Sequence, residues 1–124
     1  MEKLVLNGQE YQPARRFPRF NANHRALVVL EGDVDHLPHH VVQIGEGGLS
    51  FRYLGQKIKP GELKSLSLYL EDQLIVESVP VQPVSDYRLE GNLVPVRCMC
   101  VSFQEMSADQ KRDLDEFIKH YTSP

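Results

Sequence analysis

Apolar and polar residues alternate along several segments of this chain, and the alternation predicts β-strands. The clearest segment is 63–70, where Leu66, Leu68 and Leu70 stand at every second position. Side chains at alternate positions of a strand lie on one face, so this segment is expected to be half-buried. Apolar runs predict further strands at residues 25–30, 41–44, 49–54, 74–84 and 93–103.

Turn-forming residues separate these segments, and no helical pattern intervenes between them. Gly32 and the pair Pro60-Gly61 are examples of such turns. Pro80 and Pro83 fall inside the fifth segment. Because proline cannot donate to a strand ladder, they indicate either an edge strand or a bulge there. Strands that follow one another without helices predict an all-β, antiparallel meander or barrel.

The periodicity changes near the C-terminus, where it predicts one helix. Ser107 is the expected N-cap, and Gln110 stands three residues later, where it completes a capping box. The apolar residues that follow form one helical stripe, made by Leu114, Phe117, Ile118 and Tyr121. A single stripe of this kind is expected to lie on the barrel or to cover one of its ends.

Composition is that of one soluble globular domain. The 124 residues are 41% hydrophobic and 25% charged, with a formal net charge of −3, which is ordinary for such a domain. The acidic balance argues against bulk nucleic-acid binding, so an anion site requires a local basic patch. No apolar run approaches the ~20 residues of a membrane span, and no signal peptide is recognisable. We therefore expect a cytoplasmic location.

The N-terminal part differs from the rest of the chain. Residues 1–23 are polar and show little periodicity, which predicts an arm ahead of a barrel and helix at residues 24–124. A short strand at 3–6 fits the pattern there. Arg15, Arg16 and Arg19 crowd around Pro18, and their guanidinium groups are suited to phosphates and guanine edges.

A glycine-dense turn runs directly into the predicted strand 49–54. Glycines at such a place let another molecule or segment approach the backbone closely. Together, the arginines and this turn resemble the two motifs of the PilZ family. Arg15 and Arg19 fall on the Arg-x-x-x-Arg motif of that family, and Gly48 falls on the glycine of its Asp/Asn-x-Ser-x-x-Gly motif.

The resemblance covers nearly the whole chain and implies a fold, a ligand and a function. The implied fold is a small six-stranded antiparallel β-barrel with a C-terminal helix. The implied function is that of a non-enzymatic receptor for the bacterial second messenger cyclic di-GMP. Such a receptor has no further cofactor and relays the signal to a protein partner. The implied ligand-binding residues are Arg15, Arg16, Arg19, Gln43, Gly45 and Gly48.

The second motif departs from the family pattern at two positions. Gln43 stands where Asp or Asn is expected, and Gly45 stands where Ser is expected. Losing two polar contacts worth about 1–2 kcal/mol each weakens binding by roughly 30- to 1,000-fold. The sequence therefore leaves two hypotheses open: a receptor with a weakened site, or a ligand-independent adaptor whose nucleotide site has decayed.

A cluster of carboxylates and imidazoles precedes the second predicted strand, namely Asp33, Asp35, His36, His39 and His40. These side chains are metal ligands, so a metal site is one interpretation. The alternative is a solvated, pH-sensitive loop around Pro38. Elsewhere, no set of nucleophile, base and orienting group typical of an enzyme is recognisable.

Cys98 and Cys100 are the only cysteines, and they lie within the last predicted strand. Residues at this spacing point the same way but have poor geometry for a disulfide. We interpret them as two small buried apolar residues rather than a redox or metal-binding pair.

Overall fold

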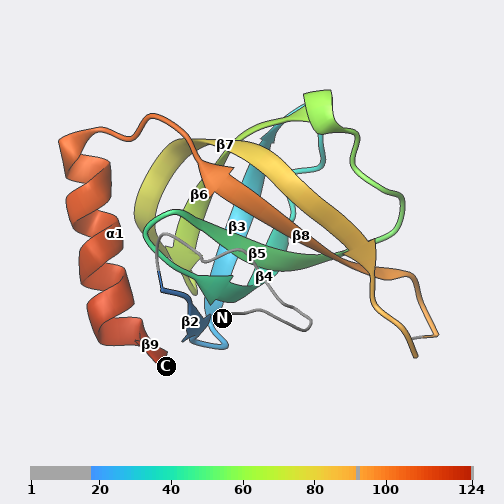
Figure 1. The fold of residues 1–124 in the computed structure, drawn as a ribbon, viewed down its shortest axis with the longest axis horizontal. Coiled ribbons are helices and arrows are strands. Elements are labelled where there is room, and N and C mark those ends of the chain that lie inside the picture. Colours follow the sequence, from blue (N-terminus) through green and yellow to red (C-terminus); the bar gives the residue numbers. More distant parts are fainter. Residues whose placement is uncertain (1–17, 92, 124) are drawn as a thin grey trace, which may run out of the picture.

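The computed structural model describes residues 18–91 and 93–123, which form a β-barrel with a helix beside it (Figure 1). Its strands are β2 (Phe20–Ala22), β3 (Ala26–Gly32), β4 (Pro38–Ile44), β5 (Gly48–Leu54), β6 (Leu63–Leu70), β7 (Gln73–Arg88), β8 (Val96–Phe103) and β9 (Thr122–Ser123). The helix is α1 (Ala108–Tyr121), and a 3-10 turn, η1, spans Pro60–Glu62. Arg15, Arg16 and the predicted strand at 3–6 lie outside the described residues.

The barrel closes because β3 and β4, which stand at opposite ends of a row of six strands, also pair with each other. The strand order is β3-β6-β7-β8-β5-β4, and β4 pairs in turn with β3. Every pairing in this ring is antiparallel. Closure leaves no open edge among the six strands, which stabilises a small all-β fold. The prediction of a six-stranded antiparallel barrel with a C-terminal helix is confirmed.

Alternation along the strands fills the barrel interior. Leu66, Leu68 and Leu70 on β6 are all buried, as the period-two pattern predicted. Phe51 on β5 and Met99 on β8 are paired residues, and both are almost completely buried. Their burial defines which way each strand faces, because the neighbouring residues on β5 and β8 must point to the outer side of the barrel.

Strand β7 is longer than the sequence predicted and is not an edge strand. It pairs with β6 on one side and β8 on the other, and it runs on to Arg88. Its register against β8 shifts between Pro83 and Ser85. A bulge accommodates a proline that cannot donate to the ladder, so the bulge interpretation is confirmed and the edge interpretation is wrong.

Three other strand ends differ from the prediction because pairing partners decide where a strand ends. Strand β3 continues to Gly32, where its register against β6 shifts. Strand β4 starts at Pro38 because the residues after it pair with β3. Strand β8 starts at Val96 rather than at residue 93, since Leu93 and Val94 lie exposed in the β7–β8 connection.

Helix α1 begins as the sequence predicted. Ser107 Oγ accepts a hydrogen bond from the Gln110 backbone N–H at 3.1 Å, and Gln110 Oε1 accepts from the Ser107 N–H at 2.9 Å. The same glutamine donates through Nε2 to the Glu77 carbonyl oxygen at 2.7 Å, which ties the helix to β7. Leu114 and Phe117 on the apolar stripe are buried, so the helix packs against the barrel.

The segment that leads into the barrel is held between two other strands. Phe20 on β2 pairs with Ile44 on β4, and Asn21 pairs with Ser123 on β9. The Asn23 N–H also donates to the Tyr121 carbonyl oxygen at 3.1 Å. Strand β2 therefore connects the end of β4 with the C-terminal end of α1.

The Glu31 carboxylate, on the outer side of the barrel, accepts hydrogen bonds from hydroxyl groups on β6 and β7. Ser65, Ser67 and Ser78 each donate a hydrogen bond to Glu31. Partial burial acts to raise the pKa of Glu31, but the three hydroxyl groups outweigh it, and the pKa is lowered. This network ties β3, β6 and β7 together away from the site described next.

Candidate functional site

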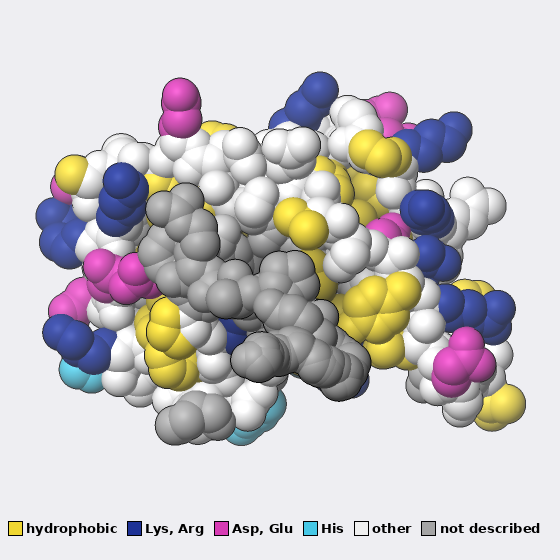
Figure 2. Space-filling view, in the orientation of Figure 1, with side chains coloured by type: hydrophobic (Ala, Val, Ile, Leu, Met, Phe, Trp, Pro, Cys, Tyr) yellow, Lys and Arg dark blue, Asp and Glu magenta, His cyan; other side chains and the backbone are white. Residues whose placement is uncertain are grey.

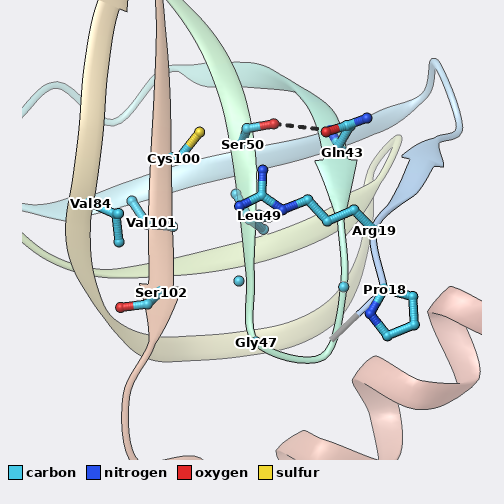
Figure 3. A pocket seen from close by; sticks show the side chains of 12 residues that line it. Pro18, Arg19, Gln43, Gly47, Leu49, Ser50, Val84, Cys100, Val101 and Ser102 are labelled. Atoms are coloured by element: carbon cyan, nitrogen blue, oxygen red, sulfur yellow. Dashed lines mark hydrogen bonds between the residues drawn. The ribbon is translucent and has the colours of Figure 1, made fainter. Parts of the chain in front are cut away.

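A hollow of roughly 200 Å³ lies over β5 and β8, between β7 on one side and β4 with residues 18–19 on the other (Figure 3). Residues 18–22, which lead into the barrel beside β4, are called the entering segment below. Four of the six residues predicted from the two motifs line it, namely Arg19, Gln43, Gly45 and Gly48. Pro18, Ser50 and Cys100 also line it. The fold thus brings the described parts of both motifs together around one space.

Two short side chains, Ser50 on β5 and Cys100 on β8, lie in the floor of this hollow, in one row across the sheet. Gln43, Ser50, Cys100 and Ser85 are successive Cα partners across β4, β5, β8 and β7. Paired residues of antiparallel strands point to the same face. Because residues 51 and 99 point into the core, this row points outward. A shallow floor of this kind suits a planar group such as a nucleobase.

Arg19 provides a cation at the edge of the hollow. It directly precedes β2, and Figure 3 shows its side chain reaching across toward Leu49 and Ser50. The residue is exposed, and within residues 18–91 and 93–123 no carboxylate forms an ion pair with its guanidinium. An exposed guanidinium beside a hollow is suited to phosphate or to a guanine edge.

Gln43 lies beside Ser50 on the neighbouring strand. Its backbone N–H donates to Ser50 Oγ at 3.2 Å, close to a register shift between β4 and β5. Its side-chain Nε2 stands 3.5 Å from Asn21 Oδ1, at the limit of a hydrogen bond. The family pattern has Asp or Asn at this position. The Gln43 amide supplies a hydrogen-bond donor and an acceptor there, but no charge, and its side chain is longer.

Gly48 is required by the close approach of two strands. A Cβ atom at this position would lie closer than 3.0 Å to the Val101 carbonyl oxygen on β8. Its φ is not in the left-handed region, so backbone conformation is not the reason for the glycine. The glycine of the second motif therefore sets the distance between β5 and β8 beneath the hollow.

The two cysteines have different surroundings. Cys98 is buried, which confirms the prediction for that residue, and burial raises the pKa of its thiol. Cys100 is half-buried and contributes to the floor. Tyr87 is the cross-strand partner of Cys98. The hydrogen bond to that thiol, followed by burial, raises the pKa of Tyr87 to about 12.

Apolar groups form part of the rim on the β7 side. Val84 lines the hollow and is exposed, and the Tyr87 side chain is exposed on the same strand. Figure 2 shows apolar side chains exposed on this face of the molecule. An apolar rim next to a cation suits a ligand that has both flat rings and anionic groups.

The predicted cluster of carboxylates and imidazoles forms one close pair. His39 Nε2 lies 3.2 Å from Asp35 Oδ1, and the His39 ring contacts the rings of Phe51 and Tyr53. Among the residues that the structure describes, no three His, Cys, Asp or Glu side chains are grouped so as to hold a metal ion. His39 instead packs against the aromatic rings of β5.

Comparison with known families identifies the chain. The PilZ domain family matches residues 13–120. The chain belongs to the PilZ domain family. No curated protein sequence matches it. Within the described residues of this PilZ domain, no helix is long and apolar enough to cross a membrane.

Solved structures show the same fold. A complex of K. pneumonia MrkH with c-di-GMP has a TM-score of 0.70 and 15% identity, covering 87% of this chain and 52% of MrkH. The PilZ domain of Escherichia coli YcgR with c-di-GMP has a TM-score of 0.62 and 16% identity, covering 88% of this chain and 92% of that domain. The chain spans about half the length of MrkH.

Two residues of the site were not among those predicted from the motifs. Ser50 and Cys100 were not predicted as site residues, although both line the hollow. One signal was available: Ser50 stands two residues after Gly48, so the two share the outer face of the strand. The binding roles of Arg19, Gln43, Gly45 and Gly48 remain predictions, as do those of the two arginines outside the described residues.

Proposed function

We propose that this PilZ domain is a receptor for cyclic di-GMP that relays ligand binding to a protein partner. The observation that carries the proposal is the convergence of Arg19, Gln43 and Gly48 around one hollow. Cyclic di-GMP presents two guanines and two phosphates. Arginine suits both groups, since it binds phosphate with two parallel hydrogen bonds and guanine through O6 and N7. The complexes of MrkH and YcgR with this ligand support the choice.

Each predicted residue has a role in this proposal. Arg15, Arg16 and Arg19 hold phosphates and guanine edges, and the Gln43 amide contacts a guanine. Gly48 keeps the turn open, and Gly45 lines the site beside it. In this proposal residues 1–23 are the arm that carries the arginines, residues 24–124 are the barrel and helix, and the protein works in the cytoplasm without catalysing a reaction.

Pairing of the entering segment supplies a route for the relay. Arg19 is followed directly by β2, and β2 pairs with β9, the strand that follows α1. A ligand that draws Arg19 inward therefore acts on the C-terminal end of the helix through backbone hydrogen bonds. We infer that the partner binds at the C-terminal end of α1 and responds to a change in its position.

Affinity is expected to be lower than that of a site with the full second motif. Gln43 lacks the charge of an Asp, and a charge-assisted hydrogen bond is roughly twice as strong as a neutral one. The substitution Gln43→Asp is therefore expected to tighten binding by about tenfold, because it adds roughly 1–2 kcal/mol.

The second candidate function is a ligand-independent adaptor. The departures at Gln43 and Gly45 favour it, because two polar groups of the family motif are missing. In that case the barrel and helix serve protein contacts alone. The substitution Gln43→Asp then gains nothing, since no ligand is bound by the arginines.

Isothermal titration calorimetry with two matched variants tests the proposal. Arg19→Ala removes the cation at the hollow, whereas Arg112→Ala removes an exposed cation on α1 that pairs with Asp109. Both variants change the net charge equally. We expect Arg19→Ala to weaken binding of cyclic di-GMP by about tenfold or more and Arg112→Ala to have little effect. Equal effects of the two would refute a specific role for Arg19.

A further inference from the structure

Gly45 is a glycine because the entering segment passes directly over it. The residue is buried, and a Cβ atom there would lie closer than 3.0 Å to the Pro18 carbonyl oxygen. Its φ is not in the left-handed region, so the turn itself accepts other residues. The collision would be with backbone rather than with a side chain that can rotate away. Close approach of the Pro18 backbone is therefore the reason for the glycine.

This contact decides where Arg19 lies. Pro18 directly precedes Arg19, and the next residue, Phe20, pairs with Ile44 at the end of β4. The path of the entering segment is thus fixed on both sides of Arg19, by the seat on Gly45 and by the β2–β4 pairing. Any side chain at position 45 would push the segment, and Arg19 with it, away from the hollow.

The Ser50 hydroxyl group accepts a hydrogen bond but, among the described residues, donates none. The residue is 6% exposed, and its Oγ accepts the backbone N–H of Gln43 at 3.2 Å. Within the described part of the chain, no acceptor bonds the hydroxyl proton of Ser50. Ser67, the other buried serine, provides a comparison: it also accepts a backbone N–H, from Ser78 at 2.9 Å, but it donates to Glu31 as well.

The hydroxyl of Ser50 therefore joins Arg19 as a donor at the hollow. Both residues line it, and Figure 3 shows the Arg19 side chain extending toward β5, the strand that carries Ser50. A ligand with phosphate oxygens or guanine O6 and N7 acceptors satisfies both donors at once. A buried hydroxyl whose donor has no partner is costly, so an acceptor at this place is favoured.

We propose that this domain has rearranged the second motif rather than lost it: Ser50 supplies the ligand-facing hydroxyl, and Gly45 is the seat for the entering segment at Pro18. The role of Ser50 rests on the proposed function, whereas the role of Gly45 does not. On this account the missing serine at position 45 is not a defect. Restoring it displaces the entering segment and gains nothing.

The role of Ser50 is tested by comparing Ser50→Ala with Ser67→Ala in calorimetric titrations with cyclic di-GMP. Both variants remove a buried hydroxyl that accepts a backbone N–H, so both are expected to lower thermal stability. Only Ser50→Ala is expected to weaken binding, by about five- to tenfold. Unchanged affinity in Ser50→Ala, or an equal loss in Ser67→Ala, would overturn the assignment.

The role of Gly45 is tested by amide hydrogen exchange without ligand. Gly45→Ala and Gly45→Ser are expected to speed exchange of the amides of residues 20–22 by about tenfold or more, since the seat is lost. Gly61→Ala is the control, because a Cβ atom at Gly61 meets nothing within 4 Å. Unchanged exchange in both Gly45 variants, or tighter ligand binding by Gly45→Ser, would refute the claim that the entering segment needs a glycine at position 45.

These experiments separate the failure of this inference from the failure of the proposed function. If the unsubstituted domain does not bind cyclic di-GMP, the receptor function and the ligand role of Ser50 are both wrong. The exchange measurement still decides the role of Gly45 in that case. If the domain binds and Ser50→Ala binds equally well, the receptor function stands and the role of Ser50 is wrong.

Discussion

The substitution Gly48→Ala tests whether the glycine of the second motif is set by strand packing. A methyl group at this position meets the Val101 carbonyl oxygen closer than 3.0 Å, and the Ser102 Cα and Val101 carbonyl carbon at 3.1 Å each. All three atoms belong to the backbone of β8, so no side-chain rotation relieves the collision. The strands β5 and β8 must separate where Gly48 pairs with Ser102.

The magnitude follows from two costs. Overpacking typically costs about 1–3 kcal/mol. Weakening of one ladder hydrogen bond adds about 1 kcal/mol. The expected loss in the free energy of unfolding is therefore about 2–4 kcal/mol, the sum of the two costs.

Urea denaturation of Gly48→Ala beside Gly61→Ala measures this loss. At a compatible site, the change from glycine to alanine stabilises by about 0.4–1 kcal/mol through the unfolded state. We expect Gly61→Ala to be neutral or slightly stabilising, and both variants to keep the slope of the unfolding curve. A Gly48→Ala variant as stable as the unsubstituted domain would refute the argument from strand distance.

Three further predictions concern polar groups outside the hollow. Glu31→Gln is expected to lower stability by about 1–2 kcal/mol at neutral pH, after allowance for solvent screening. Because the pKa of Glu31 is lowered in the folded state, the carboxylate stabilises the fold above the unfolded pKa of 4.5, and this stabilisation is lost as pH falls through the folded pKa. The difference in stability between Glu31→Gln and the unsubstituted domain should therefore vanish in acid denaturation curves. Tyr53 donates to Asp86 at 2.6 Å and accepts the Ile58 N–H at 3.1 Å, so Tyr53→Phe is expected to cost about 1–3 kcal/mol in urea denaturation, and no loss would contradict this network. Cys98→Ala is expected to move the pKa of Tyr87 from about 12 toward 10.0 in an ultraviolet phenol titration, and an unchanged value would exclude the thiol as the cause.

The sequence predicted correctly those strand and helix ends that depend on neighbouring residues alone. Strand β6 and the capped start of α1 match the prediction because the period of two and the capping box are properties of neighbouring residues. The far end of β7 was missed because it depends on pairing with β8 across a bulge at Pro83. Strand β8 was predicted to start too early because apolar character alone marked Leu93, which lies exposed.

The candidate site was predictable only where it follows a linear motif. Arg19, Gln43 and Gly48 were found by their spacing in the sequence. Ser50 was missed because its role depends on cross-strand register with Gln43, which shifts at a bulge. The reason for Gly45 was also out of reach, since the contact with Pro18 joins residues far apart in the chain.

Calorimetric titration of the unsubstituted domain with cyclic di-GMP, at low and moderate salt, tests the central claim most directly. The account predicts saturable heat with an affinity that falls as salt rises, since guanidinium groups bind the phosphates. Absence of heat up to high ligand concentration at low salt would contradict it and would favour the ligand-independent adaptor.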